Sequence, residues 1–456
     1  LFLIFLLIIR KLILKIDFIQ TLFFINTFLF LQFYGLPAYI FLTQIIKLNL
    51  ILLVIKIFHL NSKDVFLDKK INQGIQIQNH LLVSILFTNI ALFIFFEHLK
   101  NFYYENYMIH FSSWTINYTG GLNRRGFIGE ILTLNYIGVD IRFLVSLFIT
   151  LIYTTILYNI WKIFKNNKQN YISILMMISP FYLLFVVNDF RGGNFKEILG
   201  LLAFTFLVLY NSKKRFYLIV LSTLLYTFSI FSHTVNLFIF PIIIFYIYKF
   251  SNISKKNIFY TIYTSSVLTL VGLIFSPLMT NLYFDSKIWC ANLIKDFKLT
   301  NSCSDLLRGS MIDFKMNASF LDNIQYTFSN LNNFTFLNYI ILFLLANFYI
   351  VKTKFFIENK RELFIIYLSF LPLFIIALDW GRWIYILFFC LFTIYISIPK
   401  KELQFKRDKM TYLLFSIPTF LIYVPHCCAN SSITNIIAYN LDSFHLFDVF
   451  FKLYKF

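Results

Sequence analysis

The sequence predicts an all-α fold, a polytopic transmembrane helix bundle of about 11 to 13 spans with two long extracytoplasmic loops. Composition is the first reason: of 456 residues, 59% are hydrophobic, 13% are charged, and 61 are Phe. A soluble domain could not cover so much apolar side chain with so few charges. Long apolar runs that recur along the chain, and connecting loops that alternate in charge, are the other two reasons.

The same composition excludes two other classes of protein. Intrinsic disorder requires low hydrophobicity, and a nucleic-acid reader requires its basic residues clustered on a folded face. The net charge of +19 therefore points to a membrane, and we expect the bilayer as a partner and no nucleic acid.

Each predicted span is an apolar run near the length needed to cross about 30 Å of hydrocarbon. Backbone polar groups must be satisfied inside the bilayer, so these runs are expected to be helices. The expected spans are Phe18–Phe33, Pro37–Phe58, Leu81–Phe96, Phe143–Phe164, Tyr171–Val187, Ile198–Tyr210, Phe216–Phe231, Val235–Tyr248, Ile258–Leu278, Phe336–Val351, Leu363–Leu378, Ile384–Ile398 and Tyr412–Val424.

These spans divide the chain into three regions. Residues 1–80 form N-terminal hydrophobic helices, 81–430 form the transmembrane core, and 431–456 form an interfacial C-terminal tail. The apolar run Leu1–Ile9 precedes its basic residues, unlike a secretory signal, and is expected to be a truncated or interfacial piece.

The loops set the orientation. One set is short and Lys-rich, whereas the other includes the long loops 97–142 and 280–335. By the positive-inside rule the Lys-rich loops are cytoplasmic and the long loops extracytoplasmic, which predicts a multi-pass membrane protein. Cys290 and Cys303 both fall in the second long loop, where an oxidising compartment would allow a structural disulfide.

Glycine and arginine gather on this outer side. The segment Asn117–Glu130 reads NYTGGLNRRGFIGE and places Arg124 and Arg125 among four glycines. The segment Asn188–Glu197 contains Asp189, Arg191, two glycines and Lys196, and Asp379–Trp383 reads DWGRW.

Six of the ten arginines lie outside, although most of the lysines lie inside. Retention of charge in the cytoplasm requires only a cation, so an outward bias toward Arg suggests bidentate recognition of phosphate or carboxylate. We therefore expect Arg124, Arg125, Asp189, Arg191, Lys196 and Arg382 to line a substrate site. The alternative is that Asp189–Arg191 and Asp379–Arg382 are ion pairs that close helix ends.

Three residues are candidates for proton transfer. His233 follows a middle span at the outer level and titrates near neutral pH. Glu130 and Asp379 are acids in the arginine segments, and each could instead serve only to pair with an arginine. Trp114 and Trp380 could stack on sugar faces or belong to the aromatic belt at headgroup level.

Other chemistry finds little support in the sequence. The chain contains no Gly-x-x-x-x-Gly-Lys-Ser/Thr motif and no long soluble domain, which disfavours a nucleotide-driven pump. We expect no cofactor, and His426 with Cys427 and Cys428 supplies too few ligands for a metal site.

Together, the Gly120–Gly126 segment, the outer His233 and the Asp379–Trp383 turn resemble the bacterial surface-polysaccharide membrane proteins. This group includes O-antigen and capsule polymerases and related GT-C-type glycosyltransferases. The resemblance covers roughly residues 81–430. It implies a multi-pass protein of the bacterial inner membrane and glycosyl transfer at the periplasmic face from a polyprenyl (undecaprenyl) diphosphate-linked sugar, with a chain-length regulator or other envelope-assembly proteins as partners.

A metal-dependent GT-C enzyme would carry an acidic motif in its first outer loop. The core of this loop offers only Glu130, which favours repeat-unit polymerisation without a metal. Two alternatives stay open: a transporter or flippase of lipid-linked oligosaccharides, and a non-catalytic protein of envelope assembly.

Overall fold

A computed structural model describes residues 108–121, 125–134, 139–166, 171–251, 285–297, 320–330, 333–351 and 353–398. It also describes short runs and single positions between 84 and 98 and between 257 and 272, together with 303, 424 and 425. The expected spans before residue 81, the span Tyr412–Val424 apart from its last residue, and the 431–456 tail lie outside the described residues, as does Arg124.

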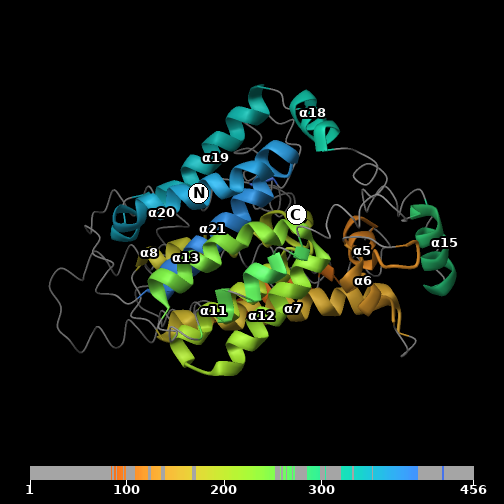
Figure 1. The fold of residues 1–456 in the computed structure, drawn as a ribbon, viewed down its shortest axis with the longest axis horizontal. Coiled ribbons are helices and arrows are strands. Elements are labelled where there is room, and N and C mark those ends of the chain that lie inside the picture. Colours follow the sequence, from red (N-terminus) through yellow and green to blue (C-terminus); the bar gives the residue numbers. More distant parts are fainter. Residues whose placement is uncertain are drawn as a thin grey trace, which may run out of the picture. The chain divides into compact units, whose positions relative to one another are not determined.

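The fold is all-α: the described segments form helices and turns and contain no strand. The chain divides into two compact units, and all of the helices discussed here belong to the larger, His98–His445. Their bounds are α5 Met108–Thr115, α6 Gly126–Thr133, α7 Ile141–Asn166, α8 Tyr171–Met177, α9 Phe185–Asn188, α10 Phe190–Gly193, α11 Ile198–Lys213, α12 Phe216–Ser232, the 3₁₀-helix η1 Thr234–Ile239, α13 Phe240–Phe250, α15 Ser286–Phe297, α18 Phe320–Asn330, α19 Asn333–Val351, α20 Lys354–Ile376 and α21 Trp380–Ser397 (Figure 1).

Helix α21 lies at the core of this unit. All of its residues from Trp380 to Ser397 are buried, and it packs against α7, α8, α11, α19 and α20. Phe185 of α9 stacks on Tyr385 of α21 at 4.1 Å between ring centroids, and the Tyr182 hydroxyl lies 2.9 Å from the Thr393 hydroxyl. An apolar helix buried on every side forms the centre of a helical bundle.

Helices α11 and α12 form a tight antiparallel hairpin. Lys214 adopts a left-handed conformation (φ 54°) after α11, and Arg215 is the N-cap of α12. Ser222 of α12 donates a hydrogen bond of 2.7 Å to the backbone oxygen of Ala203 in α11. The turn therefore brings the start of α11 and the end of α12 to the same end of the unit.

The expected span Tyr171–Val187 is not a single helix. The chain leaves α8 after Met177 and passes through turns before α9. Pro180 has no backbone N–H and clashes with a preceding helical turn, and Ser179 Oγ accepts the Phe181 N–H at 3.1 Å. The segment is nevertheless buried, so it packs as a broken helix.

Two described helices, Ile141–Lys165 and Trp380–Ser397, are long and apolar enough to cross a membrane. Four further apolar helices of 10 to 17 residues are Ile198–Lys213, Phe216–Ser232, Thr234–Phe250 and Phe336–Val351.

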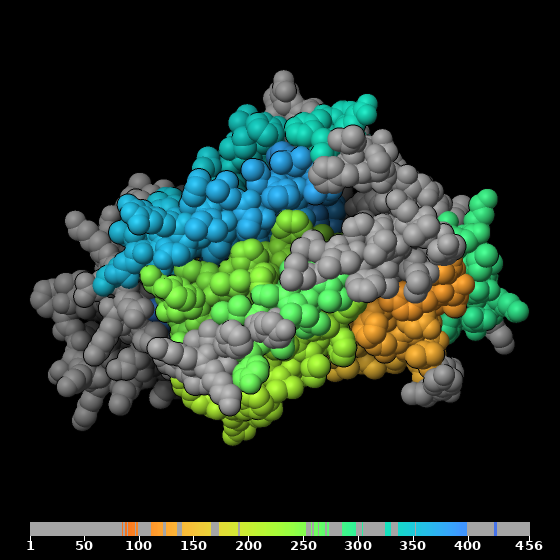
Figure 2. Space-filling model, in the orientation of Figure 1, coloured from red at the N-terminus to blue at the C-terminus, as the bar shows by residue number. Residues whose placement is uncertain are grey.

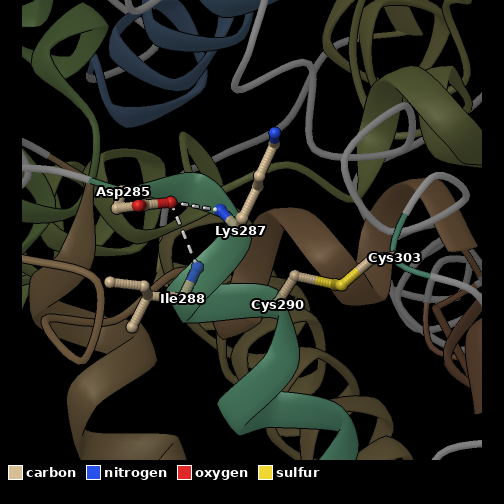
Figure 3. Close-up of a disulfide and its surroundings, with 5 residues drawn as sticks. All are labelled: Asp285, Lys287, Ile288, Cys290 and Cys303. Carbon is tan, nitrogen blue, oxygen red and sulfur yellow. Dashed lines mark hydrogen bonds between the residues drawn. A yellow bond between two sulfur atoms is a disulfide. The ribbon is translucent and has the colours of Figure 1, made fainter.

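Both long loops contain helices. The first carries α5 and α6 and the second carries α15 and α18, and Figure 1 shows α5, α6 and α15 together at one end. Asp285 caps α15, because its Oδ1 accepts the N–H groups of Lys287 and Ile288 at 2.8 and 3.2 Å (Figure 3). Cys290 of α15 is disulfide-bonded to Cys303, the pairing that the sequence suggested.

Helix α15 is fastened to the first loop by two hydrogen bonds. The Asp285 N–H donates to the Gly120 oxygen at 2.6 Å, and the buried Trp289 indole donates to the Thr115 oxygen at 3.1 Å. The disulfide-linked helix of the second long loop therefore supports the glycine-rich turn of the first.

Candidate functional site

The candidate site lies where three helix ends meet. Glu197 is the N-cap of α11, His233 is the C-cap of α12, and Asp379 is the N-cap of α21. The hairpin turn brings Glu197 and His233 to one end of the unit, and the close packing of α21 on α11 adds Asp379 and Arg382. We call Lys196, Glu197, His233, Asp379 and Arg382 the Glu197 cluster.

The Glu197 carboxylate is the centre of this cluster. Its Oε1 lies 3.7 Å from His233 Nδ1 and 3.5 Å from Arg382 Nε. Arg382 Nη2 also donates to Asp379 Oδ2. The side chains of Glu197, His233 and Arg382 are 3%, 8% and 5% exposed, so these charges interact with little screening by water.

Glu197 is held by charge rather than by hydrogen bonds. Its contacts with Arg382 and His233 are longer than a normal N–H···O hydrogen bond of about 2.7–3.2 Å. Among the described residues, neither carboxylate oxygen accepts a hydrogen bond. A buried carboxylate that lacks hydrogen bonds is costly, so its presence requires an explanation.

Two tyrosine hydroxyls complete the surroundings of Glu197. Tyr153 of α7 and Tyr385 of α21 are hydrogen-bonded to each other, and both interact electrostatically with Glu197. The Tyr153 hydroxyl also donates to the Gly193 oxygen in the segment that leads to Glu197.

Arg382 is fixed on several sides. Its guanidinium carbon lies 4.2 Å from the Phe195 ring centroid and 4.7 Å from that of Trp383. Two aromatic faces and two carboxylates therefore hold this side chain. This geometry matches the helix-closing pair between Asp379 and Arg382 that the sequence left open as an alternative, and it extends that pair to Glu197.

Lys196 joins the cluster to the first outer loop. The side chain is buried, and Nζ donates a hydrogen bond of 2.6 Å to the Arg125 backbone oxygen. Burial lowers the pKa of the Lys196 amine well below its usual value, and the positive charge of Arg125 lowers it further, whereas Glu197 acts in the opposite direction.

Glu130 makes a contact that the sequence did not suggest. Its Oε2 accepts the Tyr118 N–H at 3.0 Å, which closes the glycine-rich turn from the α6 side. Gly129 on the same helix passes so close to the Ile116 backbone oxygen that an added Cβ would lie 1.8 Å from it. The glycines of α6 thus serve close backbone packing.

Asp189 and the two tryptophans are also explained by local packing. Asp189 Oδ1 accepts the Gly192 N–H at 2.8 Å. Trp114 is fully buried and donates to the Asn194 oxygen at 2.7 Å, so its ring cannot stack on a sugar. Trp380 is 9% exposed and packs against Phe336, Tyr339 and Phe374, which corrects the same expectation.

Two expected arginines cannot be placed. Arg124 lies outside the described residues, as does the side chain of Arg191. The described segments contain no group of three or more His, Cys, Asp or Glu side chains arranged to hold a metal ion.

The sequence did not single out Glu197, Tyr153, Tyr385 or Phe195. One signal pointed to Glu197: it is an acid that directly precedes an apolar helix and follows two glycines and a lysine. The tyrosines come from spans separated by more than 200 residues, and no local pattern links them.

Comparisons with known proteins add no assignment: no family model, curated protein or solved structure matches this chain.

Proposed function

We propose that this chain is a multi-pass protein of the bacterial inner membrane that transfers sugars at its extracytoplasmic face. The donor is a polyprenyl-diphosphate-linked saccharide, and the reaction is polysaccharide repeat-unit polymerisation without a metal. The observation that carries the proposal is the buried Glu197 cluster, in which acid, imidazole and cations meet at the end of the bundle opposite the lysine-rich helix ends.

Exposed apolar side chains support the membrane setting. Along α12, Val220, Leu224 and Phe228 recur every fourth residue and are 42%, 48% and 38% exposed. Helices α7, α19 and α20 also expose large apolar side chains, and Figure 2 shows α20, in blue, on the outside of the unit. In water such stripes would promote aggregation, whereas in lipid they are the expected outer face.

The two ends of the helices differ in charge. Lys213, Lys214 and Arg215 lie at the α11–α12 turn, and Asn211 near that turn donates to the Phe250 oxygen at the end of α13. Lys249, also at the end of α13, lies 3.4 Å from Glu362 of α20. The basic residues therefore share one end, which supports a cytoplasmic assignment for it and an extracytoplasmic one for the Glu197 cluster.

The cluster offers the chemistry that such a transfer needs. A diphosphate leaving group develops negative charge, and fixed cations in a low-dielectric site stabilise it. Lys196 and Arg125 are the described basic residues beside the glycine-rich turn, and Arg124 and Arg191 belong to the same two segments. His233 and Glu197 are proton-accepting groups for the attacking hydroxyl.

The test uses cells in which the gene is deleted and complemented. Arg124→Lys and Arg191→Lys are expected to abolish long polysaccharide chains, because lysine cannot replace bidentate contacts to a diphosphate. Arg215→Lys at the basic end is the matched control and should keep the wild-type chain length. Wild-type chain length in both outer variants would contradict the proposal.

The same cells distinguish polymerisation from transport. If transfer is lost, lipid-linked saccharides accumulate in the outer leaflet, where an impermeant periodate treatment oxidises them. Accumulation in the inner leaflet would instead assign the chain to the flippases of these lipids.

A further inference from the structure

We propose that Glu197 is the general base of the transfer reaction, the group that takes the proton from the acceptor hydroxyl. This inference rests on the proposed function and adds to it a catalytic residue outside the three that the sequence suggested. The argument begins with how the carboxylates of this region use their oxygens.

The other acids near the glycine and arginine segments are occupied by local contacts. Asp379 binds Arg382, Glu130 accepts the Tyr118 N–H, and Asp189 accepts the Gly192 N–H. Glu197 differs from these three, because neither of its oxygens accepts a hydrogen bond from a described residue.

The charged neighbours of Glu197 do not use the lone pairs of its carboxylate. Arg382 Nε and His233 Nδ1 lie 3.5 and 3.7 Å from Oε1, close enough to attract the charge and too far for good hydrogen bonds. The position at the N-terminus of α11 adds the favourable helix dipole. A carboxylate in this state can accept a hydrogen bond from a ligand.

The neighbouring groups indicate a polyol as that ligand. Tyr385 donates its hydroxyl hydrogen to Tyr153, and Tyr153 donates its own to the Gly193 oxygen, so each hydroxyl keeps a lone pair that can accept a hydrogen bond from a sugar hydroxyl. Phe195, which is partly exposed, lies over Arg382 in the turn that carries Glu197.

The step balances with the groups that are present. The acceptor oxygen forms a bond to the anomeric carbon of the donor as its proton passes to a Glu197 oxygen. The bond between the anomeric carbon and the diphosphate oxygen breaks, and its electron pair leaves with the polyprenyl diphosphate. His233 is the next group that can hold the proton.

The experiment measures transfer by the purified full chain in liposomes. The probe is the lipid-linked saccharide extracted from cells that lack the gene, radiolabelled in the sugar. Glu197→Gln keeps the size of the side chain and removes its basicity, so transfer should fall by at least about 100-fold. Glu362→Gln at the basic end is the matched control, and its transfer should stay within about threefold of wild type, since its contact with Lys249 is partly exposed.

Anion rescue separates catalysis from a structural role. In Glu197→Ala, small anions should restore transfer in the order of their basicity, azide above formate above nitrite, and chloride should restore none. Equal rescue by all four anions would mean that Glu197 only balances the charges of Arg382 and His233, and this result would overturn the inference.

The two proposals fail in different ways. Full transfer by Glu197→Gln alongside an active wild-type chain removes Glu197 as the base and leaves the proposed function standing. A wild-type chain that transfers no label from the extract would contradict the proposed function itself. The melting temperature of each variant in liposomes is the folding control: a variant that loses transfer should melt at the wild-type temperature.

Discussion

Arg382 organises the buried charges of this protein. It contacts Glu197 and Asp379 through different nitrogens while its plane lies against Phe195 and Trp383. A planar guanidinium can make all of these contacts at once, whereas an ammonium acts as a point charge. Arg382 therefore holds Glu197 and Asp379 in place, and the sequence expectation that it binds substrate directly stays a prediction.

Replacing Arg382 with Lys should destabilise the fold although it keeps the charge. Lysine cannot contact both carboxylates, so one buried acid loses its partner, and we expect a cost of about 3 kcal/mol in the free energy of unfolding. Thermal unfolding in detergent measures it. The control is Arg142→Lys, whose pair with Asp140 is partly exposed and should change stability by less than about 1 kcal/mol.

His98 should make the protein sensitive to acid. Burial lowers the pKa of His98 to about 3, against which a side-chain hydrogen bond with Asn194 acts weakly. An unfolded histidine titrates near pH 6.5, so between pH 6.5 and 3 the unfolded chain binds the extra proton. Stability should therefore fall as the pH drops through this window, by at most about 1.4 kcal/mol per unit.

The test compares unfolding of the wild type and His98→Gln from pH 7 to pH 4. Glutamine does not titrate, so the variant should lose less stability over this range. Parallel curves for the two proteins would show that His98 does not control the acid response.

For individual residues, the sequence identified the residue types that gather in the site better than it identified the contacts that each residue makes. The glycine and arginine segments drew attention to Asp379 and Arg382, and the outer position to His233; all three do lie together. Glu197 became central only through packing, because its importance depends on contacts across α7, α12 and α21. Burial also changed the reading of Trp114, since a sequence does not show whether an aromatic ring faces solvent.

Helix α6 illustrates packing at the element scale. An added Cβ at Gly129 would lie 1.8 Å from the Ile116 oxygen, and backbone atoms cannot move aside cheaply. Gly129→Ala should therefore separate α6 from residues 115–116 and cost about 3 kcal/mol in unfolding free energy. Ile131→Ala, at an exposed site of the same helix, should change it by about 0.5 kcal/mol or less. Similar stability of both variants would contradict this account of the packing.

The outer face of α12 allows a test of what surrounds it. A lysine at Leu224, near the middle of the helix, would put a charge into hydrocarbon and cost about 3 kcal/mol. A lysine at Tyr217 lies beside Arg215 and can extend to the interface, so it should be tolerated. We expect far less folded chain in membranes for Leu224→Lys than for Tyr217→Lys. A water-soluble Leu224→Lys protein would contradict a lipid-facing α12.

The long apolar helices were predictable from hydrophobic runs, because the length of an apolar run can be read from the local sequence. The expected spans from Phe143, Ile198 and Phe216 correspond to α7, α11 and α12 within a few residues. The span predicted from Tyr171 is interrupted at Ser179 and Pro180, because proline lacks the backbone N–H that a continuous helix requires. The helices of the long loops were missed, since α15 depends on a cap, a disulfide and contacts with another loop.

At the scale of the whole molecule, the proposed function depends on the proposed orientation in a bilayer. The basic residues at the α11–α12 turn and the end of α13 lie at one end of the larger unit, and the Glu197 cluster lies at the other. The positive-inside rule turns this asymmetry into a prediction about compartments. If the Glu197 cluster faced the cytoplasm, a periplasmic sugar lipid could not be its substrate.

Single cysteines at the two ends test this orientation directly. In a background with Cys427→Ser and Cys428→Ser, Cys390 stays buried and Cys290 and Cys303 stay disulfide-bonded. Leu134→Cys lies after α6 and is exposed, and Arg215→Cys lies at the basic turn and is exposed. In intact spheroplasts, an impermeant maleimide should label the cysteine at 134 and should reach the one at 215 only after the membrane is permeabilised.

The background chain without either cysteine controls for unintended labelling. The reverse pattern would place the Glu197 cluster in the cytoplasm, and labelling of both sites in intact spheroplasts would mean that the hairpin of α11 and α12 does not reach across the bilayer.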